Sequence, residues 1–129
     1  MATLPNTTLT QELRIFFDNM PLPCVKNIRY IGDCVYGKIT DEILLKAEFK
    51  TLLSSNRYEL IRLSAIRKNR GEIDHVDINL PMTNTPYGRI SRKYLSKTDD
   101  GRIAWYSKPD QNEIGIICAQ ISDYVSFFQ

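Results

Sequence analysis

Cysteine and long apolar runs are scarce in this chain of 129 residues, and each scarcity excludes a class of protein. The three cysteines form no C-x-x-C pair and their number is odd, which argues against a disulfide framework and against a zinc site. No apolar run approaches roughly 18 residues, and the first residues lack the basic and apolar segments of a secretory leader, so we expect none. We therefore expect a cytoplasmic protein that does not enter a membrane.

A strong excess of charge of one sign is also absent. The net charge of +2 is too small to indicate a polyanionic partner, although residues 57–108 carry eleven basic and six acidic side chains. The chain contains no P-loop, no dinucleotide-binding fingerprint and no H-E-x-x-H, so we expect neither a cofactor nor a metal. Length and composition predict a single domain over residues 1–129, with a flexible tail over residues 1–7.

Two helices and a strand are predicted in the first half of the chain. Thr8 and Gln11 have the spacing of a capping box, ahead of apolar residues at helical spacing. A strand is predicted over residues 25–39, with a break at Gly32 or Gly37. Thr40 then suits the N-cap of a second helix, because two acidic residues follow it. The apolar stripes of the two helices are Leu9, Leu13, Phe16, Phe17 and Met20, then Leu45, Phe49, Leu52 and Leu53.

The second half of the chain predicts two β-hairpins and a final helix. The second hairpin covers residues 89–107, and Asp110 with Glu113 has capping spacing before the last element. Residues 111–127 carry apolar residues at helical spacing, whereas Gly115 and the β-branched content suit a strand, which stays the alternative. The element order α-β-α-ββ-ββ-α predicts an α+β fold, an antiparallel sheet of about five strands with helices packed on one face.

The first hairpin, residues 57–81, has a pattern that separates its two faces. A loop with an even number of residues centred on Arg70-Gly71 places six apolar residues on one face: Ile61, Leu63, Ala65, Val76, Ile78 and Leu80. The other face carries Arg62, Ser64, His75, Asp77 and Asn79. In this register Arg62 lies opposite Asn79 and Ser64 lies opposite Asp77.

This polar face is the best candidate for a binding site. Arg62 would bind a carboxylate or phosphate bidentately, with Ser64, His75 and Asn79 fixing its orientation. The alternative is a solvated sheet face that carries an Arg62–Asp77 surface pair. We predict no catalytic triad, because no strained turn or glycine-rich oxyanion donor accompanies Ser64, and no further metal ligands converge on His75.

The basic second hairpin provides an alternative site. Basic side chains that alternate with aromatic ones can track a nucleic-acid backbone and stack on bases, and they are also enriched at protein interfaces. The residues concerned are Arg89, Arg92, Lys93, Tyr94, Arg102, Trp105 and Tyr106.

The order of the first elements, from Leu9 to Pro81, resembles the first half of the chorismate lyase fold, which the ligand-sensing domains of some transcription regulators share. The resemblance rests on a strand that carries Arg62, a turn at Gly71-Glu72 and a strand that ends at Pro81. It implies that Arg62 stands where the family places a carboxylate-binding arginine. No glutamate stands where the family's last strand supplies the acid of the lyase, so the resemblance implies binding rather than catalysis.

We therefore predict a non-enzymatic ligand-binding or regulatory module that binds a small anionic molecule on the polar face of the first hairpin. Two alternatives stay open: a nucleic-acid-binding or protein-interaction domain that uses residues 89–108, and a chorismate-lyase-like enzyme. The amphipathic last helix also offers a face for a homo-oligomer.

Overall fold

The computed structural model describes residues 8–19, 25–51, 56–84, 90–98, 100 and 102–129. The predictions for residues 1–7, for Met20, Leu52 and Leu53, and for Arg89 lie outside these residues. In chain order the elements are α1 (Leu9–Asn19), β1 (Lys26–Ile31), β2 (Cys34–Lys38), β3 (Ile43–Lys50), β4 (Arg57–Tyr58), β5 (Leu60–Arg67), β6 (Gly71–Asn79), β7 (Met82–Asn84), β8 (Ile90–Arg92), β9 (Leu95–Lys97), β10 (Ile103–Trp105) and α2 (Gln111–Phe127).

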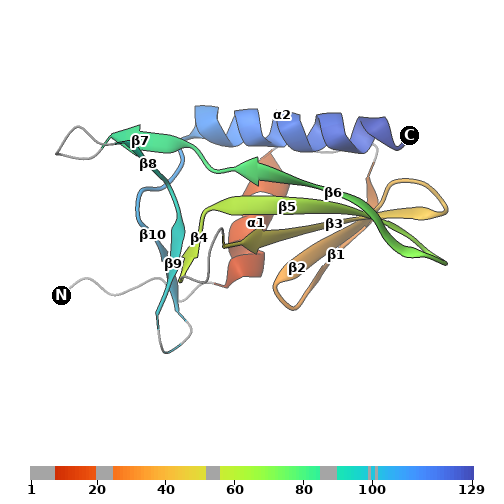
Figure 1. The fold of residues 1–129 in the computed structure, drawn as a ribbon, viewed down its shortest axis with the longest axis horizontal. Helices are drawn as coiled ribbons and strands as arrows, with labels where there is room; N and C mark the ends of the chain where they lie inside the picture. The colour runs from red at the N-terminus through yellow and green to blue at the C-terminus, as the bar shows by residue number, and fades with distance from the viewer. Residues whose placement is uncertain (1–7, 20–24, 52–55, 85–89, 99, 101) are drawn as a thin grey trace.

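Five antiparallel strands form the main sheet in the order β1-β2-β3-β5-β6, which leaves β1 and β6 at its two edges. Two smaller sheets, β10-β9-β4 and β7-β8, lie at one end of it. Helix α2 runs alongside β6, and α1 lies behind the sheet in the view of Figure 1. The predicted α+β class with an antiparallel sheet of five strands is thus confirmed.

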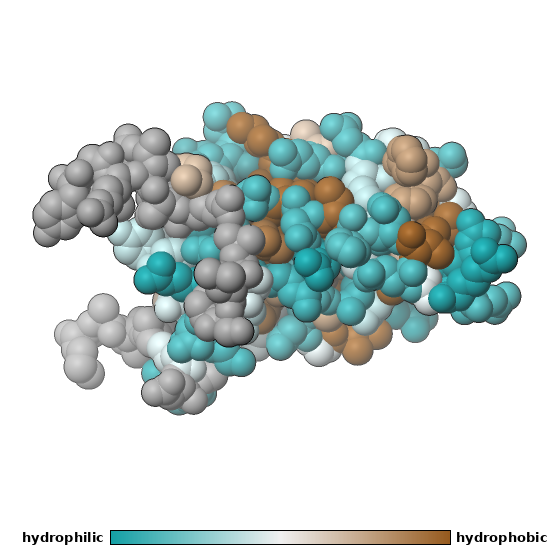
Figure 2. Space-filling model, viewed as in Figure 1, coloured by the Kyte–Doolittle hydropathy of each residue, from teal (hydrophilic) through white to brown (hydrophobic). Residues whose placement is uncertain are grey.

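The hydrophobic core lies between one face of the main sheet and the two helices. Helix α1 packs against α2, β2 and β3. Side chains from alternate positions of the strands join the helices in this core: Val35, Leu45, Ala47, Phe49, Ile61, Leu63 and Ile78. Polar side chains occupy the other positions, and hydrophilic residues dominate the middle of the surface that Figure 2 presents. The main sheet therefore has one apolar face and one open, polar face.

Both predicted capping boxes form. The Thr8 N–H donates to Gln11 Oε1 (2.8 Å), and the Gln11 N–H donates to Thr8 Oγ1 (3.2 Å). At α2, the Glu113 N–H donates to Asp110 Oδ1 (2.8 Å) and the Asp110 N–H donates to Glu113 Oε1 (2.9 Å). Residues 111–127 are helical, since their apolar stripe faces the core at every helical turn, and this outweighs the cost of Gly115.

The helix predicted after Thr40 is wrong, because residues 43–50 form strand β3 in the centre of the sheet. Leu, Lys, Ala and Glu have high helix propensity, but Leu45, Ala47 and Phe49 alternate with charged residues at the strand period of two. Thr40 caps a tight turn instead, since its hydroxyl accepts from the N–H groups of Glu42 and Ile43. Burial on both sides by β2 and β5 overrides local propensity.

The predicted strand over residues 25–39 is a hairpin, β1-β2, that turns at Gly32. Gly32 has a φ of 60°, in the left-handed region that suits glycine. The chain is not broken at Gly37, which lies within β2. A Cβ there would stand 2.2 Å from Cγ1 of Val25, so glycine allows this close approach.

Candidate functional site

The first hairpin has the predicted faces but a different register. Arg62 pairs with Asp77 and Ser64 with His75, so the partners differ from the predicted ones by two residues. The loop is a three-residue turn over residues 68–70, and the register shifts once more between Ala65 and Ile66, where β6 contains an additional residue, Ile73. A shift of two residues keeps every side chain on its face, which is why the polar and apolar sets survive.

Arg62 and Asp77 form a bidentate ion pair on the open face. Arg62 Nε donates to Asp77 Oδ1 (2.8 Å) and its Nη2 donates to Oδ2 (3.1 Å). The hydrogen bond from Arg62 lowers the pKa of Asp77 and, reciprocally, raises the pKa of Arg62. Both side chains are 35% exposed. A carboxylate ligand would therefore have to displace Asp77 from the arginine on which the predicted anion site depends.

The other predicted residues of this face do not converge on Arg62. Ser64 is buried at 3% exposure, and the ring of His75 contacts Glu72 instead, with Nδ1 3.2 Å from Oε2. Asn79 is exposed near the end of β6. No hydrogen bond joins Ser64, His75 and Asp77 into a triad, and the described residues hold no group of three or more metal-ligating side chains.

Glu48 occupies the centre of the open face, and sequence reasoning missed it because β3 was predicted to be a helix. Its carboxylate contacts Lys46 Nζ (3.0 Å) and Lys50 Nζ (2.9 Å), and the Cys34 thiol donates to it (3.3 Å). Burial alone would raise the pKa of Glu48, but the hydrogen bonds from Lys50, Lys46 and Cys34 outweigh burial and lower it to about 2. Charged and apolar residues alternate over residues 46–50, and this pattern could have indicated a strand with Glu48 on its polar face.

Several basic and aromatic side chains of the basic second hairpin contact partners within the protein, in the hairpin itself or in the two helices. The hairpin is shorter than the predicted range 89–107, because only β9 and β10 pair with each other, whereas β8 pairs with β7. Tyr94 stacks on Tyr106 with ring centroids 4.9 Å apart. The Trp105 indole N–H donates to Glu12 (2.9 Å), and Lys93 Nζ donates to Glu113 (2.6 Å). Arg102 pairs with Asp100 at 3.2 Å. The backbone of Arg92 pairs with Met82 in β7, whereas Arg89 lies outside the described residues.

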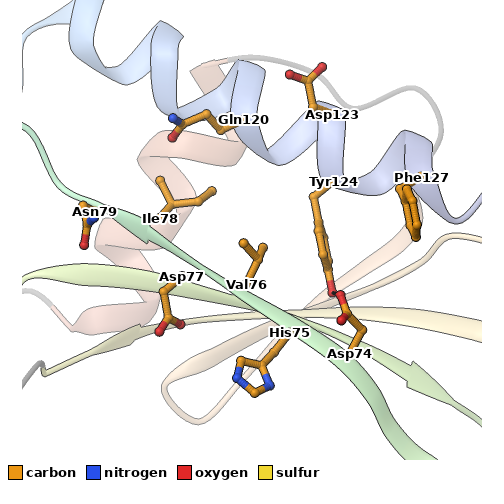
Figure 3. Close-up of a pocket in the computed structure, with 10 residues that line it drawn as sticks. All are labelled: Asp74, His75, Val76, Asp77, Ile78, Asn79, Gln120, Asp123, Tyr124 and Phe127. Carbon is orange, nitrogen blue, oxygen red and sulfur yellow. Dashed lines mark hydrogen bonds between the residues drawn. The ribbon is translucent and has the colours of Figure 1, made fainter.

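A groove of about 640 Å³ lies between edge strand β6 and helix α2. Its lining includes three predicted residues, His75, Asp77 and Asn79, although the side chains of His75 and Asp77 point away from α2 (Figure 3). Val76 and Ile78 point toward the helix, which contributes Gln120, Asp123, Tyr124 and Phe127.

The two apolar residues of β6 show how the groove opens. Ile78 is 6% exposed, whereas Val76 is 39% exposed on the same face. Phe127, the last residue of α2, is 80% exposed on the helix side. Helix α2 therefore covers Ile78 but leaves Val76 uncovered, so that an apolar surface stays open beside the sheet edge. Phe127 is a large apolar residue that is not among the buried residues of α2. Its position off the apolar side of the helix was the one indication of this site in the sequence.

The hydrogen-bond pattern of the sheet determines which backbone groups of β6 face the groove. The Leu80 N–H donates to the Glu59 carbonyl (3.0 Å), so Leu80 stands at a hydrogen-bonded position of the ladder that β6 forms with β5. Because bonded and non-bonded pairs alternate in an antiparallel ladder, the N–H and C=O groups of His75, Asp77 and Asn79 point away from β5. No strand of the residues that the structure describes pairs with this side of β6, so these outward groups form an edge of the sheet.

The groove is acidic although the chain is basic. Its described lining contains Asp74 and Asp123 but neither lysine nor arginine, while the side chain of Asp77 points away from α2 and pairs with Arg62. The Tyr124 hydroxyl donates to Asp74 Oδ2 (2.9 Å) across the groove. Burial and this contact with Asp74 raise the pKa of Tyr124, so the phenol stays a neutral donor.

Among the described residues, no helix is long and apolar enough to cross a membrane. Comparison of the chain with known protein families, with curated proteins and with solved structures finds no match, so the resemblance to the chorismate lyase fold stays a prediction and the site rests on its geometry alone.

Proposed function

We propose that this protein is a non-enzymatic interaction module that binds an extended segment of a partner protein in the groove between β6 and α2. The observation that carries the proposal is the free edge of β6 beside the exposed side chains of Val76 and Phe127. Strand addition to a sheet edge obtains affinity from main-chain hydrogen bonds and specificity from alternate side chains. We also propose that the protein is located in the cytoplasm.

The bound segment would run along β6 as a sixth strand. Its backbone would bond to the outward groups of His75, Asp77 and Asn79, and its alternate side chains would contact Val76 and Phe127. The groove's acidity favours basic residues at positions near Asp74 and Asp123. Pairing of β6 with a second copy is disfavoured, because it would bring together two strand edges that each carry Glu72, Asp74 and Asp77 and neither lysine nor arginine.

We favour this groove over the anion site that the sequence predicts at Arg62. Arg62 is engaged by Asp77, whereas the groove offers unpaired backbone groups and uncovered apolar surface. Neither feature supplies a nucleophile or a general base, which favours binding over catalysis.

Selection from a displayed library of short random peptides tests this function. We expect peptides enriched in alternating apolar and basic residues on the wild-type protein. Selected peptides should bind at least about tenfold more weakly to His75→Pro, which removes an outward N–H while leaving the bonds to β5. His75→Ala is the matched control, since it keeps the N–H and removes a side chain that points away from α2. Failure to enrich any peptide, or equal binding to both variants, would contradict the proposal.

A further inference from the structure

A second hollow, of about 460 Å³, opens on the polar face of the main sheet near its β1 edge. It shares no lining residue with the groove of the proposed function, so the two sites are separate. Among the described residues that line it, three are cations and none is acidic. The side chains that matter here are Arg29, Lys38 and Lys68 together with Ile31, Tyr36 and Leu44.

A strained residue in β1 directs one of these cations to the open face. Asn27 has a φ of 55°, an uncommon conformation for a residue other than glycine, and the β1-β2 register shifts between Lys26 and Arg29. Because of the shift, Arg29 pairs with Tyr36, whereas uninterrupted pairing from Lys26 and Lys38 would have placed Ile28 there. Such bulges commonly redirect a side chain beside a binding site.

The charges of the hollow are incompletely balanced. Lys38 pairs with Asp41 at 2.8 Å, but Arg29 and Lys68 form no ion pair or side-chain hydrogen bond with the residues that the structure describes. The pKa of Asp41 is lowered first by the hydrogen bond and charge of Lys38, and further by Lys68. Two cations of the hollow thus already act on the carboxylate of Asp41.

The floor of the hollow is apolar. Lys38 pairs with Leu44 across the β2-β3 ladder, and Tyr36 and Leu44 are both half-buried. Ile31 is 58% exposed at the end of β1. An inorganic ion would contact the cations and leave these apolar groups wet, whereas a molecule with a flat apolar body would cover them.

We infer that this hollow binds an organic anion that joins a carboxylate or phosphate group to a flat apolar body. The head group would lie between Arg29 and Lys68, and the body would cover Tyr36 and Leu44. This site is independent of the peptide groove between β6 and α2.

Titration with phenyl phosphate, followed by amide chemical shifts in NMR spectra, tests the site. We expect the largest shifts at Arg29, Tyr36, Lys38 and Leu44, with no comparable change in β6. Inorganic phosphate should bind several times more weakly because it lacks the apolar body, and benzyl alcohol should cause no saturable shift because it lacks the charge.

Arg29→Gln should weaken phenyl phosphate binding by about tenfold, since it removes a charge-assisted donor. Lys68→Gln, in a surface turn, is a second variant if the first perturbs the spectrum broadly. Lys108→Gln removes an exposed cation outside the hollow and should leave the affinity unchanged. The inference is overturned if phenyl phosphate shifts none of these amides, if inorganic phosphate or benzyl alcohol binds as well, or if the control weakens binding as much.

Discussion

Replacing Val76 with arginine is expected to weaken binding of a selected basic peptide by about a hundredfold, which corresponds to the loss of a central interface contact. Val76 is the uncovered apolar residue in the middle of the groove, and its side chain points toward α2. Arginine there would fill the apolar surface and place a cation against the basic side chains of the peptide. Titration of a fluorescently labelled peptide measures the change.

The fold should tolerate this substitution, because Val76 is 39% exposed and the longer side chain can extend into the groove. Ile31→Arg is the matched control, since Ile31 is an exposed apolar residue on the opposite edge strand. Loss of peptide affinity in the control, or unchanged affinity in Val76→Arg with an intact spectrum, would exclude the groove as the binding site.

The second large effect concerns Glu48 and the dependence of stability on pH. The folded protein lowers the pKa of Glu48 from its ordinary value of 4.5 to about 2. The carboxylate therefore stabilises the fold at pH values above 4.5, and this contribution is lost as the pH falls from 4.5 toward 2. At neutral pH we expect Glu48→Gln to lower the free energy of unfolding by about 1–3 kcal/mol, a range that allows for solvent screening.

Urea denaturation of both proteins at pH 7 and at about pH 3 measures this effect, and the difference between them should be at least halved at the lower pH. Asp41→Asn is the control, because Asp41 also pairs with a lysine but its side chain is 93% exposed. A difference for Glu48→Gln that is equal at both pH values would show that lost packing, and not its ionised carboxylate, explains the effect.

Local patterns that tertiary contacts reinforce could be predicted from the sequence. The capping residues Thr8 and Asp110 act on their own turns, and the alternation in β5 and β6 defines faces that survive a change of register. Strand β3 could not be predicted in the same way, because its residues favour a helix and only the neighbouring strands β2 and β5 make it a strand.

The candidate site was harder to predict because it depends on where α2 lies relative to β6. Val76 belongs to the apolar face and was expected in the core, but nothing in its sequence context indicates that the helix covers Ile78 and not Val76. The ion pair of Arg62 with Asp77 was expected as the alternative to an anion site, but that the two residues lie directly opposite each other depends on a turn of three residues and one extra residue in β6. The exposure of Val76 arises from helix packing and the direct pairing of Arg62 with Asp77 arises from strand register. The periodicity of the residues predicts neither.

Amide hydrogen exchange in β6, measured by NMR with and without a selected peptide, tests strand addition most directly. The amides of His75, Asp77 and Asn79 point away from β5 and should exchange fast in the free protein and slowly in the complex. The amides of Val76 and Ile78 bond within the sheet, so they should be protected in both states. Our account predicts this alternating gain of protection along β6. Unchanged exchange at His75, Asp77 and Asn79 in the saturated complex would contradict it.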